Sequence, residues 1–267
     1  MKKKLFSPWP FFALTFAWTW SFWGLAVALQ RPMGEFPVPL LVALGGVGPM
    51  VVGIALTYLT REPADRRDYW KRVFDIKRIH PSWLAVTLLT VPLLITLAVI
   101  LNLLTGGIGA SLEPRFQANL LSILPFAVFT LFFGPIPEEL GWRGFALDSL
   151  QAKYNALGSS LILGILWTIW HAPLFFIPGS YQNGLLFGTI AFWWFMLDKT
   201  FQSILMTWIY NNTGRSTLTA ILFHFMINFT GELFVLSART DIFQIIVWAL
   251  AALVVVIIWK PKTLTRL

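Results

Sequence analysis

Apolar runs recur along this chain of 267 residues, and short breaks rich in glycine, proline and polar residues separate them. The clearest breaks lie at 30–37, 105–114 and 178–184. A helix of about 20 apolar residues is long enough to cross the hydrocarbon core of a bilayer. The pattern therefore predicts eight membrane-spanning helices, at 9–29, 38–59, 82–104, 118–137, 158–177, 186–210, 216–236 and 242–259.

The predicted span at 186–210 departs from this pattern, because Asp198 and Lys199 fall near its middle. Charged residues inside a membrane helix usually face the interior of the bundle. The two residues therefore predict either a helix that begins later or a polar face turned into the bundle, and the sequence leaves both open.

The composition fits this pattern: 57% of the residues are hydrophobic and only 12% are charged. A water-soluble domain of this length carries more charge, so we expect an all-α polytopic membrane protein with an intramembrane polar cavity. The first apolar run lacks a small-x-small cleavage site, which favours a retained helix over a signal peptide. No internal repeat is visible, so we expect one integral-membrane domain over residues 1–267.

The positive charges orient the predicted helices. The net charge is +8, and sixteen Lys and Arg residues fall in loops on the N-terminal side, beginning with Lys2, Lys3 and Lys4. The opposite loops hold only three: Arg31, Arg115 and Arg239. Because positive residues accumulate in cytoplasmic loops, we expect both termini in the cytoplasm. The same bias explains the charge without a nucleic-acid partner, so the expected partner is the lipid bilayer.

The longest polar stretch covers residues 62–81. It predicts either an amphipathic surface helix or a charged connecting loop. In the helical alternative, four side chains are expected to turn toward the lipid headgroups: Tyr69, Trp70, Val73 and Phe74.

Three ionisable residues, Glu138, Glu139 and Arg143, directly follow an apolar run. If the helix continues through them, Glu139 and Arg143 stand four residues apart and can pair across one turn. Glu138 is rotated by about 100° and points elsewhere, which leaves its carboxylate free to act as a base. Pro135 and Pro137 can open the helix just before this point. The alternative is an ion cluster that ends a helix at the membrane surface.

Two of the three histidines lie inside apolar spans. His171 lies near the middle of one predicted span, with Pro173 close behind it. His224 and Asn228 are four residues apart, so they share one face of a later helix. Taken singly, each could be a polar contact between helices.

Together, these groups favour hydrolysis within the membrane. Carboxylate, imidazole and amide groups can activate a water molecule and stabilise an oxyanion. Alternatively, Glu138, His171 and His224 could hold a divalent metal such as Zn²⁺ with an open coordination position. A thiol protease is excluded because the chain has no cysteine, and neither a His-Glu-x-x-His nor a Gly-x-Ser-x-Gly motif occurs.

The order of the motifs resembles that of the CPBP family, which includes the CAAX prenyl endopeptidase and bacterial bacteriocin-processing or abortive-infection proteins. The matching motifs are Glu138-Glu139-x-x-x-Arg143, Trp167-x-x-x-His171 and His224-x-x-x-Asn228. They lie within residues 118–236, close to half of the chain. Trp167 stands where the family often has phenylalanine, an exchange of one aromatic residue for another.

The resemblance implies an intramembrane endopeptidase that acts on a membrane-associated peptide or protein, including a lipidated substrate of the prenylated CAAX type. It implies that Glu138 activates the attacking water and that His171 helps to position it. Glu139 would be oriented by Arg143. The family has been described both with and without a metal, so the cofactor stays open between none and one divalent ion.

The resemblance also implies that His224 and Asn228 stabilise the oxyanion of the tetrahedral intermediate. Two other classes of function remain open. A non-enzymatic immunity or scaffold protein of the same family could keep the polar cluster for binding. A small transporter could use buried carboxylates for ion coupling, although no two-fold repeat is visible.

Overall fold

The computed structural model describes residues 7–266, which are almost entirely helical; Lys2, Lys3 and Lys4 lie outside this range. The first half contains α1 (Trp9–Leu29), α2 (Val38–Gly46), α3 (Gly48–Thr60), α4 (Pro63–Phe74), η1 (Ile76–Arg78), α5 (Pro81–Leu104), α6 (Pro114–Ala118), η2 (Leu120–Ser122) and α7 (Ile123–Phe133). The second half contains α8 (Pro135–Gly141), η3 (Trp142–Ala146), α9 (Leu147–Gln151), α10 (Ala156–Trp170), η4 (Ala172–Phe176), α11 (Tyr181–Gly184), α12 (Ile190–Asn212), α13 (Thr217–Leu233) and α14 (Ala238–Trp259). Two short strands, β1 (Ser111–Leu112) and β2 (Phe234–Val235), pair antiparallel.

The predicted all-α polytopic membrane fold is confirmed. Six helical segments of the described chain are long and apolar enough to cross a membrane, and they coincide with six of the eight predicted spans. The other two predicted spans correspond to α12, which carries Asp198 and Lys199, and to α13, which has 17 residues. The predicted end of the fourth span at 137 is wrong, because a largely helical segment of 32 residues continues from Leu120 to Gln151.

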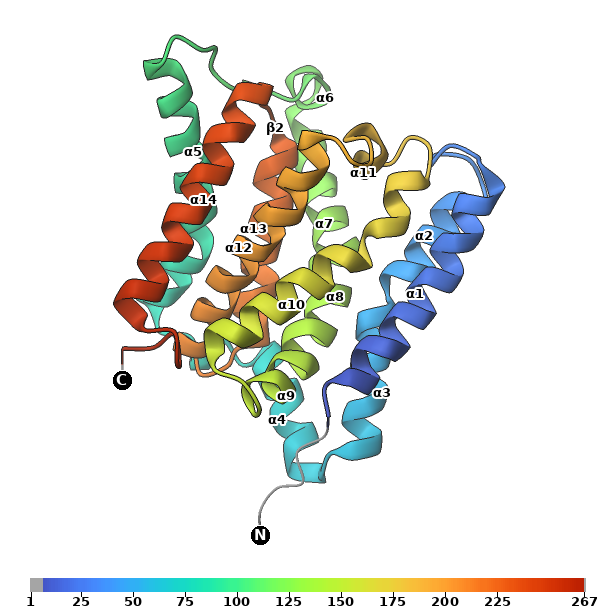
Figure 1. Ribbon diagram of the computed structural model, residues 1–267, viewed down its shortest axis with the longest axis vertical. Helices are drawn as coiled ribbons and strands as arrows, with labels where there is room; N and C mark the ends of the chain where they lie inside the picture. Colours follow the sequence, from blue (N-terminus) through green and yellow to red (C-terminus); the bar gives the residue numbers. More distant parts are fainter. Residues whose placement is uncertain (1–6, 267) are drawn as a thin grey trace.

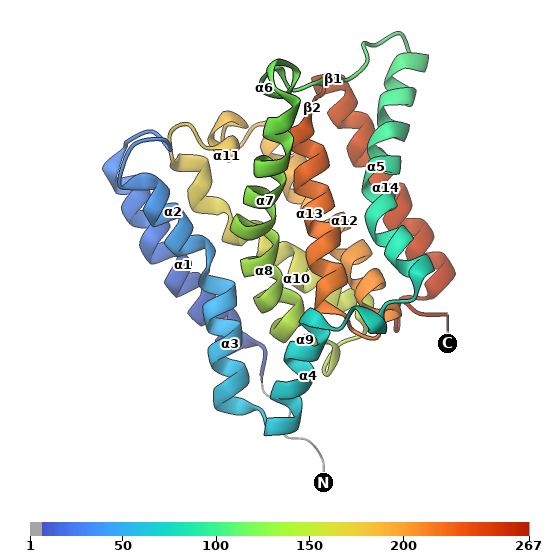
Figure 2. The same ribbon diagram turned by 180° about the vertical axis from the view of Figure 1, so that it is seen from behind.

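The helices that carry the predicted motifs lie in the middle of the bundle (Figures 1 and 2). In both views α8, α10, α12 and α13 are flanked by α1, α2 and α3 on one side and by α5 and α14 on the other. The start of α1, the end of α14 and the polar helix α4 all lie at the lower end in Figure 1. The outer helices therefore cover the central helices on these two sides.

Glycines allow α3 and α8 to approach closely. A Cβ atom added at Gly141 of α8 would lie 2.3 Å from the carbonyl oxygen of Pro49, and one added at Gly53 of α3 would lie 2.9 Å from the Gly141 Cα. Small residues at a helix crossing let backbones pack against each other within a membrane. This crossing fixes the helix that carries Glu138 and Glu139 against α3.

The polar stretch at 62–81 forms the amphipathic helix α4, so the alternative of a simple loop is wrong for residues 63–74. Its predicted orientation is only partly correct. Phe74 is 73% exposed, but Tyr69 and Val73 are buried and pack in a cluster with Leu140 of α8. The inward face of α4 therefore meets the helix of the glutamate pair, because its apolar side chains are covered better by protein than by the membrane surface.

The structure decides whether the helix that carries Asp198 and Lys199 begins after these residues. Both residues lie within the single 23-residue helix α12, so the helix does not begin after them. They are half-buried. Gln202, one turn further along, donates to the Asp198 carboxylate and accepts from the Lys199 ammonium. These residues form a polar face of α12.

Candidate active site

The glutamate pair lies just after a break in the helix. The helix α7 ends at Phe133, Gly134 has non-helical backbone angles, and α8 begins with Pro135. Proline is well accommodated at a helix start, because the first amide groups have no partner within the helix. The break places both glutamates in the first turns of α8, where Glu138 is 8% exposed and Glu139 is fully buried.

Glu139 is held by Arg143, one turn further along the chain, and by His224 of α13. The predicted pairing with Arg143 is present: Arg143 Nη1 lies 3.0 Å from each carboxylate oxygen, and both side chains are fully buried. His224 Nδ1 of α13 lies 2.9 Å from Glu139 Oε1. Arg143 Nη2 also donates to Ser203 Oγ of α12 over 3.1 Å. A buried charge pair supplied with further hydrogen bonds, as here, is the arrangement that compensates for desolvation.

Glu138 points away from this pair, as the helical spacing predicts. Its Oε2 accepts a hydrogen bond of 2.6 Å from Trp167 Nε1 of α10. Within the described chain no hydrogen-bond donor reaches its Oε1. One oxygen is therefore fixed by the indole, and the other is free to accept a proton from a water molecule.

His171 caps the end of α10, where the chain turns into η4. Its Nδ1 lies 2.8 Å from the carbonyl oxygen of Trp167. Because a carbonyl oxygen only accepts, Nδ1 carries the hydrogen and Nε2 keeps its lone pair. Trp170 and Phe195 pack edge-on against the imidazole, with ring centroids 4.8 Å and 5.6 Å away. These contacts fix the plane of the ring.

His224 and Asn228 lie on one face of α13, as their spacing predicts. Asn228 Nδ2 is 3.3 Å from His224 Nε2. The carboxylate of Glu139 accepts from Nδ1, so the neutral imidazole accepts from Asn228 at Nε2, and the second amide hydrogen of Asn228 remains available. Gly134 leaves room for this amide, since a Cβ atom there would lie 3.2 Å from Asn228 Nδ2.

Trp167 connects the three motifs. It donates to Glu138, its carbonyl oxygen accepts from His171, and its ring meets the His224 ring edge-on at 5.1 Å. A phenylalanine at this position would have no N–H group to donate to Glu138.

The structure also assigns contacts that the sequence did not suggest. Ser203 sits in an apolar run with no motif around it, yet it accepts from Arg143 and donates to the Ser160 carbonyl oxygen over 3.0 Å. Tyr69 of α4 donates to the Leu140 carbonyl oxygen over 2.9 Å, and Arg72 Nη2 donates to that of Gly144 over 3.2 Å. Leu140 lies just before the π-helix η3 and Gly144 lies within it, so α4 satisfies backbone groups beside Arg143.

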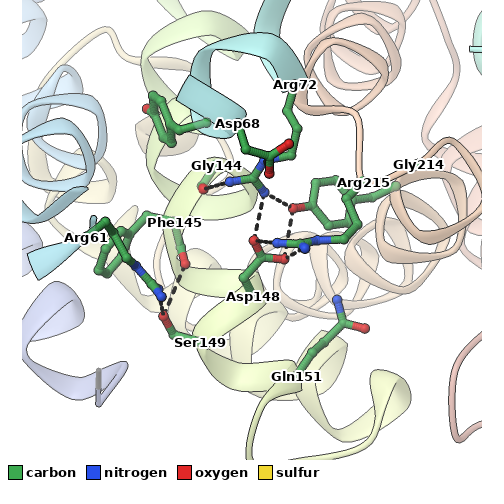
Figure 3. Close-up of polar contacts among 12 residues, drawn as sticks. Arg61, Asp68, Arg72, Gly144, Phe145, Asp148, Ser149, Gln151, Gly214 and Arg215 are labelled. Atoms are coloured by element: carbon green, nitrogen blue, oxygen red, sulfur yellow. Dashed lines mark hydrogen bonds and ion pairs between the residues drawn. The ribbon is translucent and has the colours of Figure 1, made fainter. Parts of the chain in front are cut away.

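Asp148 of α9 contacts side chains from three other parts of the chain (Figure 3). Arg72 Nη1 lies 2.7 Å from Asp148 Oδ2, Tyr210 donates to Oδ1 over 3.0 Å, and Arg215 forms a further ion pair. Burial alone would lower the pKa of Arg72, but Tyr210 and Asp148 outweigh it and raise that pKa. The guanidinium therefore stays charged and ties α4 to α9 and α12.

The metal-binding alternative gains no support from the arrangement of side chains. Between residues 7 and 266, no three His, Cys, Asp or Glu side chains gather in a way that could hold a metal ion. The candidate ligands contact other groups: Glu138 accepts from the indole of Trp167, His171 donates to the Trp167 carbonyl oxygen and His224 lies against Glu139. The steps proposed below use only side chains of this chain.

Comparisons with known proteins point in the same direction as this geometry. Residues 120–230 match the family model described as type II CAAX prenyl endopeptidase Rce1-like. The chain is 29% identical over 266 residues to CAAX prenyl protease 2 of Methanococcus maripaludis, and the match covers 98% of this chain and 97% of the relative. All three motifs lie inside the matched region. This multi-pass membrane protein is therefore similar to CAAX prenyl endopeptidases, over residues 120–230 to the family model and over nearly its whole length to the Methanococcus relative.

Proposed function

We propose that this protein is an intramembrane endopeptidase that hydrolyses a peptide bond in a membrane-associated protein or peptide with a prenylated C-terminus of the CAAX type. The match of residues 120–230 to the Rce1-like family model and the name of the Methanococcus relative support the reaction class. The observation that carries the proposal is the convergence of Glu138, His171 and His224 around Trp167, deep in a bundle of apolar helices.

In this mechanism Glu138 acts as the general base. Its free Oε1 accepts a proton from a water molecule, which then attacks the carbonyl carbon of the scissile bond. The lone pair on His171 Nε2 accepts a second hydrogen of that water and orients it. Trp167 holds the carboxylate in place during this step through its 2.6 Å hydrogen bond.

The tetrahedral intermediate carries a negative oxygen that needs hydrogen-bond donors. Asn228 Nδ2 offers its second hydrogen to this oxygen, and His224 Nε2 orients the amide by accepting the first. Glu139 fixes the ring of His224 by accepting from Nδ1, while Arg143 holds Glu139 in position. The proton taken up by Glu138 then passes to the leaving amine and completes hydrolysis.

The test is cleavage of a synthetic farnesylated CAAX peptide by the purified full-length protein, followed by mass spectrometry. Glu138→Ala and His171→Ala should each abolish cleavage while membrane insertion persists. Glu35→Ala is the matched control, because Glu35 is exposed in the loop between α1 and α2. Cleavage that survives in both site variants would refute the assignment. A wild-type protein that cuts nothing, but whose ion flux depends on Glu138, would favour a transporter.

We also propose that both termini face the cytoplasm. The common location of the α1 start and the α14 end supports this topology, together with the excess of Lys and Arg in the loops on that side. Labelling of single cysteines introduced at Lys153 and Glu35 in sealed cells tests it: only the residue at position 35 should react from outside.

A further inference from the structure

Lys199 places a positive charge inside the bundle, beside the candidate active site. Its Nζ lies 5.5 Å from the centre of the Trp167 ring and 5.4 Å from that of Phe195. Trp167 donates to Glu138, and Phe195 packs edge-on against His171. The ammonium group therefore lies against the two aromatic rings that contact the proposed water-activating side chains.

This ammonium group has no ion-pair partner among residues 7–266. It donates to Gln202 Oε1 over 3.1 Å, and Gln202 in turn donates to Asp198, so an amide separates the neighbouring carboxylate from the charge. An unpaired charge at this depth is costly, and such residues usually mark a site that binds something. An ammonium group has three hydrogens, so two remain for a ligand. The side chain is half-buried and thus keeps some accessible surface.

We propose that Lys199 binds the C-terminal carboxylate of the substrate and makes the enzyme selective for substrates that end close to the cleaved bond. This inference rests on the proposed peptidase function. A CAAX motif ends its chain, so the carboxylate lies three residues beyond the prenylated cysteine. Three extended residues span about 10 Å.

The layout of the site matches such a short segment. The indole of Trp167 contacts both groups: the Lys199 ammonium lies over the ring, 5.5 Å from its centre, and the ring N–H donates to the Glu138 carboxylate. A peptide whose scissile bond lies at Glu138 can therefore place a terminal carboxylate at Lys199 without a long extension. The aromatic rings beside Lys199 exclude water and strengthen the ion pair that forms there.

The first measurement compares three farnesylated peptides with the full-length protein. One has a free C-terminal carboxylate, one has a carboxamide, and one has a carboxamide with glutamate as its last residue. The wild type should prefer the free acid by about tenfold or more in kcat/KM, mainly through KM, because a charge-assisted hydrogen bond discriminates by at least that factor.

In Lys199→Met the ratio of acid to amide should fall to about one, whereas Lys199→Arg should retain a preference for the acid. Lys153→Met, at an exposed lysine after α9, is the matched control and should keep the wild-type ratio. The proposal is overturned if Lys199→Met keeps the wild-type ratio or slows both peptides equally. Equal cleavage of the free acid and the glutamate-ended amide would overturn it as well. The site would then accept a side-chain carboxylate in place of the C-terminal one.

A binding measurement separates this inference from the proposed function. Equilibrium binding of fluorescently labelled acid and amide peptides is measured with Glu138→Gln and with Glu138→Gln/Lys199→Met. If the acid binds more tightly than the amide and this preference disappears in the double variant, the role of Lys199 is supported. This holds even if the wild type cleaves no peptide, because the absence of cleavage would defeat only the peptidase assignment. Equal binding of acid and amide to Glu138→Gln would overturn the role of Lys199.

Discussion

The buried pair of Glu139 and Arg143 allows a quantitative test that does not depend on catalysis. In Arg143→Met the side chain keeps much of its volume but loses its charge. The Glu139 carboxylate then remains fully buried, with the His224 imidazole as its remaining hydrogen-bond partner. The second variant, Glu139→Gln/Arg143→Met, removes the stranded charge and still offers His224 Nδ1 an acceptor.

The magnitude follows from the burial of both side chains. Removing one partner of a buried ion pair costs about 3–5 kcal/mol, because an uncompensated charge stays away from water. For a chain of this size that corresponds to a fall in Tm of about 6–20 °C. In the double variant, loss of the charge should restore at least half of the Tm lost in Arg143→Met, while peptide cleavage stays absent in both.

The assay is thermal unfolding of the purified protein in one detergent at one protein concentration. Four proteins are compared: the wild type, Arg143→Met, Glu139→Gln and the double variant. The coupling term of this double-mutant cycle isolates the pair from other effects of each substitution. A double variant that is no more stable than Arg143→Met would refute the reasoning. The ion pair would then not be the reason why Arg143 stabilises the fold.

Three further predictions follow from single contacts. Trp167→Phe removes the only donor seen at Glu138 in the described chain and should lower kcat by about tenfold or more, whereas Trp193→Phe, at an exposed position, should have little effect. Gly141→Ala should lower Tm clearly, because the added Cβ atom would overlap a backbone carbonyl of α3. Gly231→Ala should not, because no atom lies within 4 Å of a Cβ atom added there, and equal melting temperatures of the two variants would contradict the packing argument. Cleavage should survive incubation with a chelator, because the proposed base is a carboxylate and no step uses a metal; activity lost on chelation and restored by Zn²⁺ would contradict that mechanism.

Much of the fold follows from one-dimensional properties of the chain. An apolar run long enough to cross a bilayer must satisfy its backbone hydrogen bonds internally, so it forms a helix wherever it stands in the sequence. That is why the predicted range 9–29 coincides with α1 and 82–104 nearly coincides with α5. The prediction was least accurate after Gly134, where the chain stays helical although its residues are charged.

Some contacts of the candidate site also follow from the sequence, and others do not. Contacts at helical spacing were predictable, because residues four apart share a helix face: Glu139 meets Arg143, and Asn228 meets His224. Trp167 was visible in the sequence, but its hydrogen bond to Glu138 was not. That contact depends on where α10 presents the indole relative to α8.

The sequence by itself therefore determined a bundle of membrane helices and the presence of a candidate set of catalytic side chains. Only the tertiary structure decided that His224 meets Glu139 across 85 residues of chain, that Arg72 of α4 reaches Asp148, and that Lys199 faces the indole of Trp167. The physical reason is that helical periodicity sets which residues share a face of one helix. The rotation and depth of each helix depend on packing against its neighbours, such as the glycine crossing of α3 and α8, and no local pattern encodes them.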